Sequence, residues 1–154
     1  MHSRKLAATL VAGLAFVAIA AVAVAQDVTV DPAIAALSPA DMVLKREELM
    51  KSNGGTLRTA GSLAGAEAVA AADTLIYNFS NLPVLFGDST KDIQTDALPA
   101  VWDNAEGFNA IMLKALEAAT AMKTAAEAGD AAAYATANKT LGAACGECHQ
   151  SFRS

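Results

Sequence analysis

Residues 145–149 read C-G-E-C-H, and the expected arrangement of the whole chain follows from what this stretch can bind. On a helix, Cys145 and Cys148 lie three positions apart on one face, where both thiols can add to the two vinyl groups of one porphyrin. His149 can then offer an imidazole nitrogen to the iron from the same side of the ring. C-x-x-C-H is the attachment motif of a c-type haem. The sequence therefore predicts one haem c, attached through Cys145 and Cys148 and bound at the iron by His149.

A pair of cysteines alone would also fit other sites. A thioredoxin-type dithiol belongs in a strand–helix–strand context, and the sequence shows no strand pattern. A zinc site with four protein ligands needs further Cys or His side chains, yet the chain has only these two cysteines and one other histidine, His2. A disulfide between Cys145 and Cys148 would close a very short loop. The remaining alternative is an alanine-rich helical binding protein whose C-x-x-C is a redox or structural dithiol.

Residues 1–25 have the features of a secretory signal peptide. Arg4 and Lys5 give a positive start, residues 6–22 are apolar, and A-V-A at 23–25 is a cleavage site of the A-x-A type. The alternative is a single membrane anchor that stays uncut, although the apolar stretch is short for a spanning helix. We expect secretion and cleavage, which would leave residues 26–154 as one domain, free of the membrane.

The predicted mature chain is acidic. Two of the 11 basic residues, Arg4 and Lys5, lie in the signal peptide, so nine basic residues remain against 16 acidic ones. The formal charge changes from −5 for the whole chain to −7. A surface of this sign disfavours nucleic acid as a partner. We expect instead a protein partner with a basic patch.

Composition predicts an all-α protein, because the chain is rich in Ala and has few aromatic residues and few β-branched runs. Residues 26–37 are expected to form an extended arm. Ser38, Pro39 and Asp41 then form a strong helix start, since Ser can cap, Pro suits the first helical position and Asp places a negative charge in the first turn.

Four helices are expected, and the fourth carries the C-x-x-C-H motif. The first three cover about residues 39–60, 66–82 and 99–128, with one long connection at 87–98. Gly129 and Asp130 are predicted to end the third helix and cap the fourth. Four amphipathic helices with one longer connection predict an antiparallel four-helix bundle in up-down-up-down order, with haem on the C-terminal helix.

The residue opposite His149 decides the chemistry of the iron. His2 leaves with the signal peptide, so the second axial position is vacant, holds water or takes a methionine. The candidate methionines are Met42, Met50, Met112 and Met122.

One face of the first helix favours Met50. Arg46, Met50 and Gly54 lie four residues apart and share this face. The guanidinium can pair with a haem propionate, and the glycine leaves room for a flat ring. We therefore predict Met50 as an iron ligand and Arg46 as a haem contact, with Met112 and Met122 as core residues.

The sequence resembles the class II c-type cytochromes, the cytochrome c′ family, over essentially the whole predicted mature chain. The resemblance rests on the single haem motif at residues 145–153 (C-G-E-C-H-Q-S-F-R), on Arg46 followed by E-L-M-K-S-N-G-G at 48–55, on L-P-V-L-F at 82–86 and on P-A-V-W at 99–102. It implies a four-helix bundle with one covalent haem c on the fourth helix. It further implies that Arg46 contacts a propionate and that Arg153 lies near the imidazole of His149. Dimerisation through the first two helices is common in the family, so a homodimer is an open expectation.

This family has two branches, and they imply different functions. In the high-spin branch the sixth iron position is empty and small gases such as NO and CO bind. In the low-spin branch a Met at the position of Met50 ligates the iron. The sequence resembles the low-spin branch, which implies a periplasmic mono-haem electron carrier and not an enzyme. The alternative is a high-spin protein that binds NO or CO at an open or displaceable site.

Overall fold

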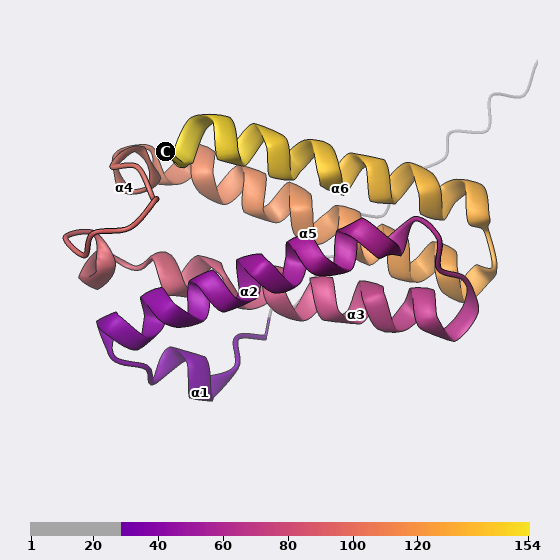
Figure 1. The fold of residues 1–154 in the computed structure, drawn as a ribbon, viewed down its shortest axis with the longest axis horizontal. Helices are drawn as coiled ribbons and strands as arrows, with labels where there is room; N and C mark the ends of the chain where they lie inside the picture. Colours follow the sequence, from indigo (N-terminus) through magenta and orange to yellow (C-terminus); the bar gives the residue numbers. More distant parts are fainter. Residues whose placement is uncertain (1–28) are drawn as a thin grey trace, which may run out of the picture.

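The computed structural model describes residues 29–154, and the predicted signal peptide at residues 1–25 lies outside them. The described chain is helical and forms a four-helix bundle, as predicted (Figure 1). The elements in chain order are α1 (Pro32–Ala35), α2 (Pro39–Ala60), α3 (Gly65–Asn81), the 3-10 turns η1 (Pro83–Phe86) and η2 (Asp88–Thr90), α4 (Ala100–Asp103), α5 (Ala105–Ala128) and α6 (Ala131–Phe152). No helix among residues 29–154 is long and apolar enough to cross a membrane.

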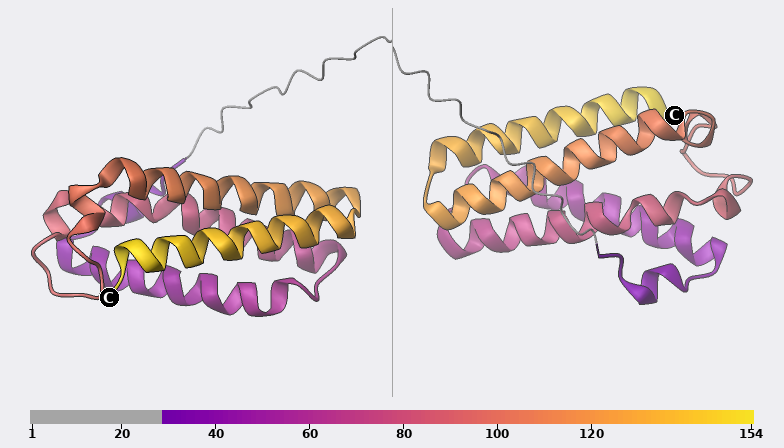
Figure 2. Two further views of the ribbon diagram at one scale, coloured as in Figure 1. Left: turned by 90° about the horizontal axis from the view of Figure 1, so that it is seen from above. Right: turned by 180° about the vertical axis from the view of Figure 1, so that it is seen from behind.

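The four long helices run up, down, up and down. Helices α2 and α3 form one hairpin, α5 and α6 form the other, and α3 packs against α5 between them. Figure 2 shows α6 alongside both α5 and α2, with the chain end close to α4. Of the neighbouring long helices, α2 and α6 touch each other least, so space for a ligand lies between these two.

Local caps place both ends of this arrangement as expected. The Ser38 hydroxyl accepts a hydrogen bond from the Asp41 amide at 3.2 Å, at the start of α2. The Asp130 carboxylate accepts one from the Ala133 amide at 2.9 Å, at the start of α6. Gly129 ends α5 in the left-handed region, with φ of +69°. Gly129 and Asp130 therefore form the turn that returns α6 along the bundle.

Two predictions about helix boundaries are wrong. The third helix does not run unbroken over residues 99–128, because Asn104 leaves the helical region and its side chain caps the Gly107 amide at 3.2 Å. Gly107 suits this cap, since a Cβ there would meet the Asn104 side chain at 2.5 Å. A short α4 thus precedes α5.

The extended arm predicted for residues 26–37 is the second error. Within the described part, Pro32–Ala35 form the helical turn α1. The Asn81 side chain accepts from the Asp31 amide at 2.8 Å, and the Tyr77 hydroxyl donates to the Asp31 carboxylate at 2.8 Å. Ile34 is buried against the bundle. A prolyl start and a local Asp cap compensate for the low helix propensity expected of such a short segment.

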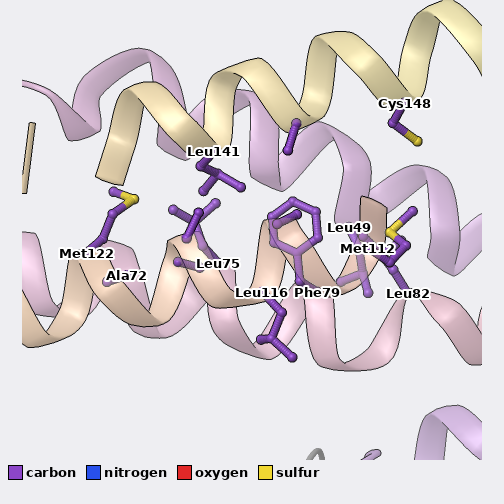
Figure 3. Close-up of a cluster of buried hydrophobic side chains, with 14 of the residues drawn as sticks. Leu49, Ala72, Leu75, Phe79, Leu82, Met112, Leu116, Met122, Leu141 and Cys148 are labelled. Carbon is purple, nitrogen blue, oxygen red and sulfur yellow. The ribbon is translucent and has the colours of Figure 1, made fainter. Parts of the chain in front are cut away.

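The core consists mainly of Leu, Phe, Met and Ala side chains from all four long helices (Figure 3). Small Ala side chains let the helices approach closely, and the larger residues Leu75, Met122 and Leu141 are fully buried among them. Figure 3 shows Cys148 at one end of this cluster and Met122 towards the other. The cysteine motif therefore lies where the core opens towards the α2–α6 gap.

The two glycines of the C-terminal hairpin should respond oppositely to alanine. Gly129→Ala should lower the free energy of unfolding by about 1–2 kcal/mol, because a Cβ is strained at positive φ. Gly142→Ala should raise it by about 0.5–1 kcal/mol, because Gly142 is in the helical interior of α6 with open space around it. Denaturant unfolding measures both. Equal effects at the two positions would contradict the left-handed cap.

Candidate haem site

Helix α6 presents the two thiols and the imidazole at the edge of the core. Cys148 is buried, Cys145 is half-buried and His149 is exposed. The two cysteines are not joined by a disulfide. Burial raises the pKa of the Cys145 thiol, and burial with the nearby Cys145 and Glu147 raises that of Cys148 to about 11. Desolvation lowers the pKa of His149, and the positive charge of Arg153 lowers it further. A lowered pKa favours the neutral imidazole that binds metals.

Two adjoining cavities lie between α2 and α6. The larger has a volume of about 590 Å³ and the smaller about 100 Å³. Both are lined by Met50 and Gly54 from α2 and by Cys148 and His149 from α6. The larger volume is within the range of about 300–1,000 Å³ found for sites of small molecules and cofactors.

The two cavities differ in chemistry. The smaller one contains Cys145 and is otherwise lined mostly by apolar side chains, namely Leu57, Phe79, Ile111, Met112, Ala115 and Ala144. The larger one is lined by the charged residues Arg46, Glu47, Lys51, Arg58, Asp96 and Arg153. A haem has the same division, with an apolar vinyl edge and a carboxylate edge. The residues present therefore fit this group, with Cys145 at the apolar end and Cys148 where the two cavities meet.

Arg46 is the most unusual residue of the larger cavity. Its side chain is only 3% exposed, and burial lowers its pKa. One guanidinium nitrogen, Nη2, donates to the Thr95 hydroxyl at 3.0 Å, and the guanidinium carbon lies 4.4 Å from the centre of the Phe86 ring. The other terminal nitrogen, Nη1, is buried without a hydrogen-bond partner. An unpaired buried donor costs about 1–3 kcal/mol, so a carboxylate in this cavity would stabilise Arg46.

All five predicted site residues, Arg46, Met50, Cys145, Cys148 and His149, thus line the same pair of cavities. Met50 comes from the opposite helix to His149. Met112 is buried in the core as expected but also lines the smaller cavity. Arg153 lines the larger cavity and pairs with Asp96 at 3.4 Å.

Comparison with known proteins agrees with this geometry. The family model described as cytochrome c′ matches residues 41–153. The chain belongs to the cytochrome c′ family.

Individual relatives cover most of the chain. Cytochrome c′ from Pararhodospirillum photometricum is 32% identical over 123 residues, covering 75% of this chain and 98% of that protein. Cytochrome c-556 from Agrobacterium tumefaciens (strain B2A) is 41% identical over 121 residues, which cover 72% of this chain and 95% of that protein. The crystal structure of cytochrome c′ from Thermochromatium tepidum is 26% identical with a TM-score of 0.70, covering 77% and 98%. The family binds one covalent haem c, as C-x-x-C-H predicts and as the dithiol alternative does not.

Sequence reasoning missed an aromatic wall of this cytochrome c′ site. Phe86 packs edge-on against Phe108 with ring centres 4.8 Å apart, and Phe108 packs against Phe152 at 5.4 Å. All three line the larger cavity. The Trp102 indole donates to the Phe86 carbonyl at 2.9 Å and so fixes η1 beneath Arg46. Phe86 and Trp102 belong to L-P-V-L-F at 82–86 and P-A-V-W at 99–102, two of the motifs on which the family resemblance rests. These motifs could have indicated the aromatic wall.

The connection between α3 and α4 completes the charged end. The Leu98 amide donates to the Phe152 carbonyl at 3.0 Å, and the Ser154 amide donates to the Asp96 carbonyl at 2.9 Å. These bonds hold the connection against the end of α6. Thr95, which accepts from Arg46, is thereby kept at the cavity wall.

Replacing Arg46 should loosen this connection. Arg46→Ala removes a charged hydrogen bond and a cation–π contact, so we expect a loss of about 2–4 kcal/mol in the free energy of unfolding. Backbone amides of residues 91–97 should exchange faster in hydrogen exchange. Lys51→Ala is the matched control on the same helix, because its exposed ion pair at 3.9 Å with Glu47 is worth at most about 0.5 kcal/mol. Equal losses in both variants would remove Arg46 from this structural role.

Proposed function

We propose that this cytochrome c′ family protein is a mono-haem electron carrier of the low-spin branch. In this proposal Cys145 and Cys148 attach the haem, His149 binds the iron from α6 and Met50 binds it from α2. The observation that carries the proposal is that Met50 and His149, from opposite helices, line the same two cavities. When bound, the haem supplies an iron that accepts and releases one electron.

The surrounding side chains would tune and shield that centre. Arg46 offers its unpaired Nη1 to a propionate. Arg58, which also lines the larger cavity, is a further cation and forms no salt bridge within residues 29–154. Leu57, Phe79 and Ile111 exclude water at the apolar end. Two protein ligands leave no position for a substrate, so the proposal does not include catalysis.

A second candidate function is binding of NO or CO. The observation that favours it is the cavity of about 100 Å³ beside Met50, since its apolar lining could receive a thioether that has left the iron. The name cytochrome c′ of the relative from Pararhodospirillum photometricum is also compatible with this function. The spectrum of the protein decides between the two.

The proposal extends to the cellular location and the redox partner of the protein. We propose that residues 1–25 direct export to the periplasm and that residues 26–154 form the working domain. A redox partner with a basic patch would suit the acidic chain. A homodimer is compatible with a solved cytochrome c′ described as having a ligand-controlled dimer dissociation.

Covalent haem attachment should be visible in the protein's mass. The mature protein should carry the added mass of one haem, and this mass should persist after denaturation. Replacing both Cys145 and Cys148 by Ala should abolish it. A denatured protein with the mass of the bare chain would refute attachment through these thiols.

The identity of the axial ligand is tested by two matched substitutions. Met50→Leu should convert a low-spin oxidised spectrum, with its methionine–iron charge-transfer band, into a high-spin one and should allow CO to bind the reduced form. Met112→Leu changes a second methionine of the same cavity and should leave the spectrum unaltered. A wild-type protein that is already high-spin and binds CO tightly would support the gas-binding function instead.

A further inference from the structure

Asn53 has the second unpaired buried donor of the site. It lies on α2 one turn after Met50, is 3% exposed and lines the smaller cavity together with Met50. Its amide nitrogen, Nδ2, is buried without a hydrogen-bond partner. Among the otherwise mostly apolar walls of this cavity, Asn53 is a polar residue that sequence reasoning did not select.

Helix α3 fixes the orientation of this amide. The Asn78 side chain donates to Asn53 Oδ1 at 2.7 Å and to the Ser52 hydroxyl at 3.1 Å. Because Oδ1 is occupied from the side of α3, the unpaired Nδ2 lies on the other edge of the amide group. Asn81, another buried Asn of α3, differs, since its nitrogen donates to the Tyr77 carbonyl at 2.8 Å and its oxygen accepts from Asp31 at 2.8 Å.

Met50, three residues before Asn53 on α2, carries a sulfur on the wall of the same cavity. Residues three apart on a helix are surface neighbours, and both residues line the same cavity of about 100 Å³. A thioether sulfur is a weak acceptor that can take one N–H. The amide is already immobilised by Asn78, so little conformational freedom is lost when this bond forms.

We infer that Asn53 is a positioning residue for Met50. Nδ2 has no partner in this structure; in the haem-loaded protein its N–H would donate to Met50 Sδ and hold the sulfur towards the face where His149 lies. The inference rests on the proposed function, in which Met50 binds the iron. A donor on the sulfur withdraws electron density from it and so favours the reduced iron. It also restricts the rotamers of Met50 and so opposes its displacement.

The test is substitution of Asn53 in the haem-loaded protein. Asn53→Leu keeps the volume and removes the donor. We expect a lower reduction potential, a shifted methionine–iron charge-transfer band, and tighter CO binding to the reduced form by about 2- to 10-fold, the factor of one net hydrogen bond. Asn53→Gln retains an amide and should restore part of each change.

Two further variants keep the test decisive. Asn81→Leu removes a buried Asn outside the cavity and should leave potential, band and CO affinity unchanged. Asn78→Leu releases the amide of Asn53 but keeps the donor, and it should shift all three readings in the same direction by less. This variant substitutes for Asn53→Leu if that protein does not fold.

Failure of this inference is distinguishable from failure of the proposed function. A wild-type protein without the charge-transfer band contradicts ligation by Met50 itself, and the role of Asn53 falls with it. A wild-type protein with the band, but with potential and CO affinity unchanged in Asn53→Leu, overturns only the inference. A change confined to the stretching frequency of bound CO would show that Asn53 serves an external ligand, and it would overturn the inference as well.

Discussion

Attachment of a cofactor from one side is the constraint on which this structure depends. Cys145, Cys148 and His149 share one end of α6, so they can hold a flat ring by one edge and one face. The opposite face must come from another helix. The bundle provides it by keeping α2 apart from α6 while the other neighbouring long helices pack more closely. The α2–α6 gap is therefore a consequence of the motif and not a defect of packing.

Two unpaired buried donors lie on the cavity walls, at Arg46 and Asn53. Buried donors are nearly always hydrogen-bonded in folded proteins, yet Arg46 Nη1 and Asn53 Nδ2 are not. The two atoms belong to different cavities, one charged and one apolar, and both residues lie on α2. Their side chains are held from behind by Thr95 and Asn78. Helix α2 therefore holds two donors in fixed positions without acceptors. Such side chains are preorganised for a ligand, because their conformational entropy is lost on folding and not on binding.

The sequence was informative where a local rule has a single outcome. The caps at Ser38 and Asp130 follow from residue type, and the periodicity of Arg46, Met50 and Gly54 placed them on one wall. It failed where tertiary contacts decide. The turn α1 exists because Tyr77 and Asn81, over 40 positions away in the chain, bind Asp31. The break at Asn104 was hidden because the flanking residues favour helix equally well. Asn53 escaped notice because a buried Asn and an exposed one look alike until its neighbours are known.

Charge at the site also revises the simple picture of an acidic protein. Four cations line the larger cavity against two carboxylates. Lys51 pairs with Glu47 and Arg153 with Asp96. Under the proposed function, Arg46 and Arg58 would then be the cations available to the two propionates of a haem. These two charges would balance the cofactor locally, so its carboxylates would add little to the field outside. The attraction of a basic partner must then come from the acidic residues elsewhere on the surface. The guanidinium of Arg46 is buried. Its charge would therefore affect the haem iron more than it affects a partner at the surface.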